Sequence, residues 1–366
     1  MLRPPQLMQA VRLNPDGEQT VTNVTVPQAT GDEVLIQVLS SSMDGTDLEQ
    51  IHGRHTIATA RDITQGHEYA GRVATIGESV TAFRVGDRVT GPFGIHCAAC
   101  TYCSRSQTNL CLNQTVFGFG RDGAWAEYLL APERVLTLLP KPLSFDDGAL
   151  LCCTVPTVLR AMDRSPITPG NHVAIFGLGQ MGLTAVMAAS MESPSTLIAI
   201  DPINSRRQLA IAWGATHTLD PSVENAHTHV LDITNGIGAN LCIITASSLA
   251  APGPGSVAST AFESVARGGQ VTIIGLIGDQ AANFNHLISK EFTVLGTKAS
   301  LGPTYVARAV AQATEGTWPM TRYRDIITHR VALNDLPTTI ANDRLRGAIK
   351  ILITPPVNDS QNTSEA

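Results

Sequence analysis

The chain has 366 residues, of which 43% are hydrophobic and 15% are charged, and its formal net charge is −6. This length favours two domains over one, and the composition is typical of a globular enzyme. The negative charge argues against nucleic acid as a partner, and no apolar run reaches the roughly 18 residues that a membrane span needs. The first residues, MLRPPQLMQAVRL, lack the apolar core of a secretory signal, so we expect a cytoplasmic protein with no membrane partner.

The first 150 residues predict short β-strands punctuated by glycine. Such segments favour a barrel-like β domain over a helical one. They are EVLIQVL (33–39), AGRVATIG (70–77), GDRVTG (86–91) and GAWAEYLLAP (123–132).

Four of the seven cysteines fall within fifteen residues, in a lobe over about 96–112. Disulfides that close such short loops would be strained, so metal binding is the better interpretation. Four thiolates leave no open position on a tetrahedral zinc, which predicts a structural ion. Free or redox-active thiols are one alternative; a zinc ribbon for nucleic acid is another, although only Arg105 and His96 are basic here. The predicted ligands are Cys97, Cys100, Cys103 and Cys111.

Strands and helices alternate from about residue 155 onward, which predicts a parallel sheet with helices on both faces. A helix over about 205–213 ends at Gly214, and a loop is expected over 250–256. The chain then ends with a helix (305–316), a strand (348–354) and a polar tail (355–366). The strands expected in this sheet are HVAIFG (172–177), TLIAID (196–201), NLCIIT (240–245), GGQVTIIG (268–275) and EFTVLG (291–296).

A dinucleotide-binding motif, Gly177-x-Gly179-x-x-Gly182, joins the first of these strands to a helix. The three glycines allow a tight turn, close approach of a pyrophosphate, and close packing of helix on strand. Asp201 ends the next strand, where a carboxylate binds ribose hydroxyls and disfavours the 2′-phosphate of NADP, so NAD is the expected cofactor. Arg206 lies close enough to weaken that preference, and a glycine turn that only packs is the alternative.

With both motifs in one chain, the sequence resembles the zinc-containing medium-chain dehydrogenases, the family of alcohol, polyol, threonine and glucose dehydrogenases. The resemblance runs from VLIQVLSSSMDGTDL through GHEYAGRVATIGESVTAFRVGDRV to GAIKILITP. It implies a GroES-like β-barrel catalytic domain formed by residues 1–157 and 298–366. It also implies a Rossmann domain, with a doubly wound parallel sheet, over 158–297. Members are commonly homodimers or homotetramers.

The resemblance also implies a second, catalytic zinc. Its family ligands are a cysteine in a CGTD-like segment, the histidine of GHE, and either the adjacent glutamate or a later cysteine. His67 and Glu68 match, and Cys153 matches the later cysteine better than Cys152 does. Asp44 stands where the first cysteine belongs, so the oxygen donor predicts a weaker and more labile zinc. The alternatives are a turn aspartate in a site without metal, a core histidine beside a surface glutamate, and a buried, unreactive Cys153.

Four more positions follow from the resemblance. Thr46 matches the family's proton-relay hydroxyl, and Asp47 matches a residue that orients the ligand histidine. Glu49 occupies the place where the family often has a relay histidine, and His52 is a nearby substitute. The alternative is that Thr46 is a turn hydroxyl bonded to the backbone and Asp47 a turn carboxylate.

The predicted function is a hydride transfer between NAD and a secondary alcohol of a polyol, sugar or amino-cyclitol-like substrate. The set of Asp, His and Glu resembles polyol and sugar enzymes, and FGFGRDGAWAEYLL (117–130) resembles a cleft-lining segment of that branch. Arg121, Asp122 and Glu127 are candidates for binding substrate hydroxyls, or are structural. A dehydrogenase of a simpler alcohol or of threonine is one alternative, and a catalytically inactive relative that binds nucleotide and zinc is another.

Overall fold

The structure, a computed structural model, describes residues 4–53, 59–60, 62–246, 256–278, 282–298, 302–342, 344–345 and 347–356. The predicted loop over 250–256 and the predicted tail over 355–366 lie outside these ranges, apart from Ser256, Pro355 and Pro356. The chain divides into two compact units: unit 1 is Met1–Pro156 with Ser300–Ala366, and unit 2 is Thr157–Ala299.

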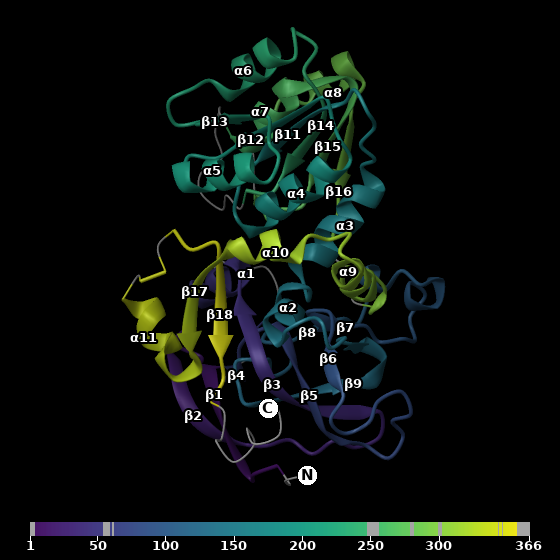
Figure 1. Cartoon of the computed structure of the whole chain (residues 1–366), viewed down its shortest axis with the longest axis vertical. Helices are drawn as coiled ribbons and strands as arrows, with labels where there is room; N and C mark the ends of the chain where they lie inside the picture. The colour runs from purple at the N-terminus through teal and green to yellow at the C-terminus, as the bar shows by residue number, and fades with distance from the viewer. Residues whose placement is uncertain are drawn as a thin grey trace. The chain divides into compact units, whose positions relative to one another are not determined.

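Unit 1 is built on a mostly antiparallel main sheet, in which β17 and β18 pair in parallel, and on two further small sheets (Figure 1). Its main sheet has the order β10-β6-β5-β3-β18-β17, and β9 also pairs with β3; the small sheets are β2-β1-β4 and β7-β8. The strands are β1 (Leu7–Leu13), β2 (Gln19–Thr25), β3 (Glu33–Met43), β4 (Ile63–Thr64), β5 (Glu68–Ile76), β6 (Arg88–Thr90), β7 (Gly94–Ile95), β8 (Thr115–Val116), β9 (Tyr128–Pro132), β10 (Thr137–Leu138), β17 (Ile327–Ala332) and β18 (Lys350–Thr354). The helices are α1 (Gly45–Ile51), α2 (Phe145–Leu150), α9 (Thr304–Glu315), α10 (Met320–Tyr323) and α11 (Leu336–Ala341), while α3 (Thr154–Arg164) begins in unit 1 and ends in unit 2.

Strand β3 organises this unit because it pairs with three others. Its first half lies against β9, most of its length lies against β5, and its last residues lie against β18. Two register shifts, at Leu35/Ile36 and Val38/Ser40, are typical of β-bulges, which bend a strand and allow it to pair with all three partners. The C-terminal strand is therefore part of the same sheet as the N-terminal strands, and Asp44 follows directly after β3.

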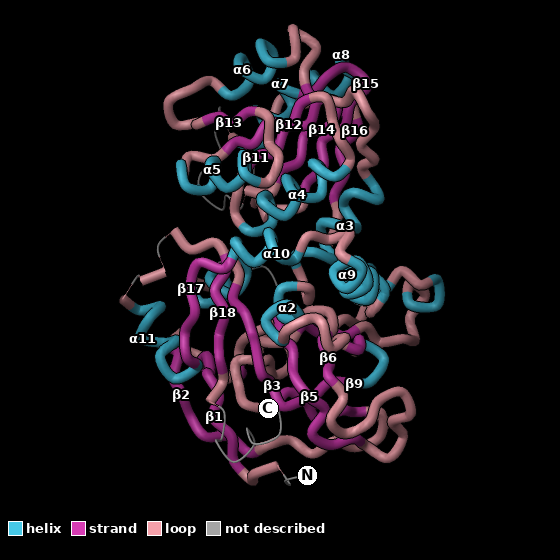
Figure 2. The backbone as a smooth tube through the Cα atoms, viewed as in Figure 1, coloured by secondary structure: helices cyan, strands magenta, loops and turns pink. Residues whose placement is uncertain are grey.

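Unit 2 is a six-stranded parallel sheet of order β13-β12-β11-β14-β15-β16. Helices α4 and α5 pack on β11, β12 and β13, and α7 and α8 pack on β14 and β15, as Figure 2 lets the reader follow. The strand order reverses at β11, and α/β sheets bind ligands at such a point. The elements are β11 (His172–Phe176), α4 (Gln180–Met191), β12 (Thr196–Ile200), α5 (Asn204–Ala212), β13 (His217–Leu219), α6 (Ala226–Ile233), β14 (Ala239–Ile244), α7 (Val257–Ser264), β15 (Val265–Ile273), α8 (Asn285–Lys290) and β16 (Thr293–Gly296).

The sequence prediction of a doubly wound sheet is confirmed, and the differences concern the ends of elements. The strand expected over 33–39 continues to Met43, because its last residues pair with β5 and β18. The helix expected over 305–316 ends one residue earlier, since Gly316 has a φ of 81° and caps it in the left-handed conformation.

A buried carboxylate fastens the C-terminal segment of unit 1 to α2. Asp147 accepts hydrogen bonds from Arg324 Nε and Nη2, both at 2.8 Å, and from the backbone N–H of Ser144 at 2.8 Å. Burial by itself would raise the pKa of Asp147, but Arg324 and Ser144 outweigh it and lower the pKa below its usual value.

Asp147→Ala should therefore lower the free energy of unfolding by about 2 kcal/mol at pH 7, because it removes the two hydrogen bonds from the half-exposed Arg324 and a helix cap. A carboxylate with a lowered pKa stabilises the fold above its unfolded-state pKa, so the difference between variant and wild type should shrink as the pH falls below about 4. Thermal unfolding at pH 7 and pH 3.5 measures both effects. Asp146→Asn, in the adjacent and more exposed position, is the control and should change stability by less than about 1 kcal/mol.

Candidate metal and cofactor sites

One ligand atom from each of Asp44, His67, Glu68 and Cys153 comes together in unit 1, all within 4.8 Å of one another. The first three side chains are buried, and Cys153 is partly buried. They come from three separate segments: the start of α1, the start of β5, and the turn between α2 and α3. The structure thus brings together the four residues that were predicted to hold the catalytic zinc.

The two carboxylate oxygens of Asp44 have different contacts, one with the helix α1 and one with the cluster. Its Oδ1 accepts hydrogen bonds from the backbone N–H groups of Thr46 (2.7 Å) and Asp47 (3.3 Å), and Asp44 is therefore the N-cap of α1. Its Oδ2 lies 3.4 Å from His67 Nε2, and the residue is only 6% exposed. Asp44 is therefore not a solvated turn residue; one oxygen fixes the backbone and the other faces the imidazole.

The imidazole of His67 is oriented from behind by Asp47. The Asp47 Oδ1 atom lies 2.9 Å from His67 Nδ1, which leaves Nε2 directed toward Asp44. Such a carboxylate–histidine pair fixes the ring position of a metal ligand. The rings of Phe93 and Phe119 lie 6.3 and 6.4 Å from the imidazole, centroid to centroid, and supply an apolar wall that the sequence reading did not identify.

The two carboxylate oxygens of Glu68 have different surroundings. Oε2 accepts a hydrogen bond from Ser42 Oγ at 2.6 Å and forms an ion pair with Lys350 Nζ. Oε1 is buried and has no hydrogen-bond partner among the described residues. A buried oxygen left without a donor is rare, and a metal ion would satisfy it. Carboxylate, imidazole and thiolate are all zinc donors, so the residues present fit the ion.

The pKa values in the cluster reflect its mixture of charges. Burial raises the pKa of Asp44, but His67 and Lys350 outweigh it and lower that pKa below its usual value. Burial and the Asp44 charge raise the pKa of Asp47. Burial lowers the pKa of His67, but Asp47 and Asp44 raise it well above 6.5 overall. Burial likewise lowers the pKa of Lys350, but Glu68 and Asp44 outweigh it and raise that pKa above its usual value. The charged side chains of this buried cluster are thus stabilised by one another and not by solvation.

The structure separates the two adjacent cysteines. Cys152 Sγ donates to the carbonyl of Gly91 at 2.6 Å and packs in the hydrophobic core, as expected for a packing residue. Cys153 belongs to the ligand cluster, and burial raises the pKa of its thiol although His67 acts in the opposite sense. The choice of Cys153 over Cys152 therefore agrees with this geometry.

The predicted proton-relay residues all belong to α1 but differ in position. Thr46 is partly buried, and its backbone N–H is bonded to Asp44. Glu49 is partly buried in the middle of the helix. His52 is exposed at the C-cap, eight residues after Asp44 and thus about 12 Å along the helix axis. The structure does not bring His52 to the cluster, which leaves Thr46 and Glu49 as the nearer candidates.

The four-cysteine lobe brings its sulfur atoms to the spacing of a tetrahedral site. The Sγ···Sγ distances are 3.9 Å for Cys97–Cys103, 3.6 Å for Cys100–Cys103 and 4.0 Å for Cys100–Cys111. Four sulfurs at about 2.3 Å from one zinc would be ~3.8 Å apart. Backbone N–H groups lower the pKa of Cys100 to about 6, while burial and neighbouring sulfurs raise that of Cys103 to about 12. The lobe fits a zinc ion that brings all four thiolates together.

Cys103→Ser should release the structural zinc, because one hydroxyl cannot replace a thiolate in a closed site. Metal content should fall by one zinc per chain, and the unfolding temperature should fall with it, since metal binding stabilises the fold. Metal analysis together with thermal unfolding tests this. Cys242→Ser is the matched control: Cys242 is a buried cysteine of unit 2, and its substitution should leave the zinc content unchanged.

The glycine motif of unit 2 adopts the conformation that its sequence predicts. Gly177 has a φ of 94°, which favours glycine. A Cβ on Gly182 would lie 1.8 Å from the carbonyl oxygen of Gly177, so helix α4 could not pack with any larger residue. Gly179 is the N-cap of α4, and a Cβ there would meet nothing within 4 Å. The space in front of the helix N-terminus is therefore open, as binding of a pyrophosphate requires.

Asp201 connects this turn to the end of β12. Its Oδ2 accepts the backbone N–H of Leu178 at 2.7 Å, and its Oδ1 accepts that of Ile203 at 2.8 Å. Arg206 Nη1 lies 3.9 Å from Oδ2. A cavity of about 350 Å³ opens beside the carboxylate, and the charged or titratable side chains that line it are Asp201, Glu224, His227 and Glu263, with no lysine or arginine.

The polar residues of segment 117–130 have structural partners. Arg121 forms an ion pair with Glu33 at 2.7 Å, Asp122 forms one with Arg12 at 3.1 Å, and Glu127 accepts the backbone N–H of Gln9. The structural alternative therefore fits Arg121, Asp122 and Glu127 better than a role in binding substrate. Trp125 is fully buried in the core.

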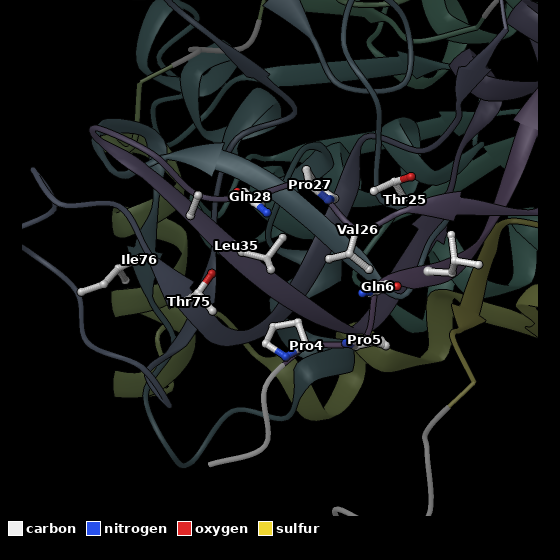
Figure 3. Close-up of a pocket in the computed structure, with 12 residues that line it drawn as sticks. Pro4, Pro5, Gln6, Thr25, Val26, Pro27, Gln28, Leu35, Thr75 and Ile76 are labelled. Carbon is white, nitrogen blue, oxygen red and sulfur yellow. The ribbon is translucent and has the colours of Figure 1, made fainter.

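A second hollow of about 710 Å³, shown in Figure 3, lies between the N-terminal residues, the end of β2 and the end of β5. Its lining consists of apolar and uncharged polar residues such as Pro4, Val26, Leu35 and Ile76. It offers no titratable group for acid–base chemistry or metal binding. Among the described residues, the candidate functional sites are therefore the Asp44 cluster, the four-cysteine lobe and the glycine turn.

Comparisons with known proteins agree with this pair of sites. Residues 30–141 match the family model "Alcohol dehydrogenase GroES-like domain" and residues 177–314 match "Zinc-binding dehydrogenase". A sorbitol dehydrogenase of Bacillus subtilis is 34% identical over 275 residues, covering 74% of this chain and 76% of the relative. The chain belongs to the zinc-containing medium-chain dehydrogenase family.

Other members of the family extend the comparison. The L-threonine 3-dehydrogenase of Pyrococcus horikoshii is 32% identical over 80% of this chain and 82% of its own. A Sinorhizobium meliloti structure described as a zinc-binding dehydrogenase bound to NADP has a TM-score of 0.85 at 30% identity, covering 96% of this chain and all of the other. The fold is thus the GroES-like barrel with a Rossmann unit, and the protein is an oxidoreductase of the zinc alcohol, polyol and threonine dehydrogenase family with NAD(P) binding. Among the described residues, no helix has the length and apolarity to cross a bilayer.

Proposed function

We propose that this dehydrogenase transfers hydride between NAD and a secondary alcohol of a polyol, sugar or amino-cyclitol-like substrate. The observation that carries the proposal is the buried group of Asp44, His67, Glu68 and Cys153 in a chain that also has the open glycine turn. The similarity to a sorbitol dehydrogenase supports a polyol-like substrate. All seven cysteines are free, which fits a reducing cytoplasm.

In this proposal the four residues of the cluster hold the catalytic zinc. When bound, zinc supplies a Lewis acid that lowers the pKa of the substrate hydroxyl. Asp47 keeps the ring of His67 in place, and the Phe93 and Phe119 rings limit access of water beside it. The alcohol loses a proton and a hydride and becomes a carbonyl. A nicotinamide cofactor, which the glycine turn of unit 2 and Asp201 would hold, would supply the hydride acceptor.

We assign the released proton to the hydroxyl of Thr46, with Glu49 as the next group on the same helix. Thr46 is two residues from Asp44 and bonded to it through its backbone, so its side chain starts next to the cluster. His52 lies at the far end of α1 and is the weaker candidate. A glutamate in place of a relay histidine would accept the proton as a carboxylate.

The charge around the nucleotide cavity supports NAD over NADP. Three carboxylates line it, and they would repel an added 2′-phosphate. Arg206 lies close to Asp201 and offers the opposite attraction, and the Sinorhizobium relative was solved with NADP. The similarity to threonine dehydrogenases favours an amino-acid alcohol as the second candidate substrate.

The test is NADH formation, followed by absorbance, on a panel of polyols, sugars, L-threonine and simple alcohols, with and without added Zn²⁺. The proposal is supported if polyols or sugars reduce NAD with the highest kcat/KM of the panel. Preference for L-threonine selects the alternative. No reduction of NAD or NADP by any compound with two zincs per chain would identify an inactive relative. His67→Ala, which removes the imidazole, is the negative control.

We also propose a homo-oligomer, with the edge of the unit 2 sheet as its contact. Within the described residues, strand β16 pairs with β15 alone, and Val294 on it is exposed, as are Phe284 at the N-cap of α8 and Ile288 within that helix. Such an apolar edge is well suited to a second copy. Val294→Lys should shift the mass in light scattering from twice or four times 38.8 kDa toward 38.8 kDa. Val223→Lys, an exposed valine elsewhere on unit 2, should not; equal masses for wild type and Val294→Lys would contradict this contact.

A further inference from the structure

Lys350 is a cation in an unusual place. It is 1% exposed, among the largest fully buried side chains of the described chain, and it begins the C-terminal strand β18. That strand runs antiparallel to β3, with Ile351 opposite Met43. Lys350 therefore lies beside the end of β3, where Asp44 follows, although 306 positions separate the two in sequence numbering.

The partner of Lys350 is the Oε2 atom of Glu68, which also accepts a hydrogen bond from Ser42 Oγ at 2.6 Å. The second oxygen, Oε1, is buried without a hydrogen-bond partner among the described residues. One oxygen of Glu68 is thus anchored, and the other is left for the metal.

The charges explain why a lysine is placed here. Asp44 and Glu68 are two buried carboxylates in one cluster. Without metal, an uncompensated buried carboxylate is strongly destabilising. Lys350 is the cation that pairs with Glu68, since Arg324 is bound to Asp147 and His67 already lies between Asp47 and Asp44.

We propose that Lys350 is a positioning residue that acts as the resident counter-ion of the catalytic metal site. Through its ion pair with Oε2 it holds the Glu68 carboxylate in its orientation when zinc has left, so that the site stays formed and can be reloaded. The same positive charge repels an arriving Zn²⁺. Lys350 therefore lowers the affinity for zinc while it raises the stability of the metal-free protein. This inference rests on the proposed function, because it requires zinc at this cluster.

Lys350→Met separates this role from simple packing. The unfolding temperature of the variant should fall by about 10 °C in protein chelated to one zinc per chain, because Glu68 is then buried without a cation. With two zincs per chain the fall should be less than half as large, since the metal replaces the missing charge. The dissociation constant of the second zinc, from competition with a chelator, should become about tenfold smaller because a repelling charge is gone.

Two further variants serve as controls. Lys350→Arg keeps the charge and should stay close to wild type in both metal states. The double variant Glu68→Gln with Lys350→Met removes both charges and should regain much of the stability that Lys350→Met loses without metal. If Lys350→Met does not fold, the double variant still decides the question: its failure as well would show that packing, and not charge, explains Lys350.

Equal falls of the unfolding temperature in the two metal states, or weaker zinc binding by Lys350→Met, would overturn the inference while leaving the proposed function intact. A wild-type protein that binds only one zinc at any concentration would overturn the proposed function and this inference together. Metal analysis of the wild type therefore comes first.

Discussion

Replacement of Asp44 by alanine is expected to remove the second zinc and to lower kcat/KM by about 1,000-fold or more, since the Lewis acid supplies several kcal/mol of transition-state stabilisation. It should also destabilise unit 1 by ~1 kcal/mol, because the same side chain caps α1. Metal analysis, steady-state kinetics and thermal unfolding measure the three effects on one preparation.

Two further substitutions divide the roles of Asp44. Asparagine is as good a helix cap as aspartate, so Asp44→Asn should keep stability while losing charge and most zinc affinity. Cysteine restores a thiolate and should bind zinc more tightly, but it should lose the cap and about 1 kcal/mol of stability. Two tightly held zincs and wild-type turnover in Asp44→Ala would show that Asp44 is only a helix cap.

Replacement of Asp201 by serine is expected to lower kcat/KM for NAD by about 100-fold, because a charge-assisted hydrogen bond to the ribose is lost. The ratio of NADP to NAD activity should rise at the same time, since the nearest negative charge is gone while Arg206 remains. The two backbone donors that Asp201 holds, Leu178 and Ile203, should loosen and add to the loss with NAD.

Initial rates with both cofactors at a saturating substrate concentration test this expectation. Asp220→Asn is the matched control, because Asp220 follows the neighbouring strand and pairs with Arg207 at 3.0 Å but does not line the nucleotide cavity. An unchanged cofactor ratio in Asp201→Ser would assign the choice of cofactor to other residues.

Local spacing made part of these sites readable from the sequence. The glycine motif and the four cysteines each lie within one short segment, so their geometry follows from the chain itself. The capping box of α1 is also local, because Asp44 and Asp47 are two acids three residues apart in the sequence.

Pairs that are distant in sequence could not be predicted in this way. Glu68 and Lys350 are 282 positions apart, and a lysine in the apolar strand AIKILIT gave no sign that it is buried. Arg121 and Asp122 suggested a polar cleft, yet their partners Glu33 and Arg12 lie 88 and 110 positions away and make them structural. Only the pairing of strands reveals such contacts.

The position of β18 between β3 and β17 has a consequence for biosynthesis. During translation the four residues that we propose as zinc ligands leave the ribosome long before Lys350, with the whole of unit 2 made in between. The main sheet of unit 1 remains incomplete until β18 has been synthesised and pairs with β3. Under the proposed function, Lys350 is therefore the last part of the metal site to be made, and a nascent chain that stalls before residue 350 would leave Glu68 without its ion-pair partner.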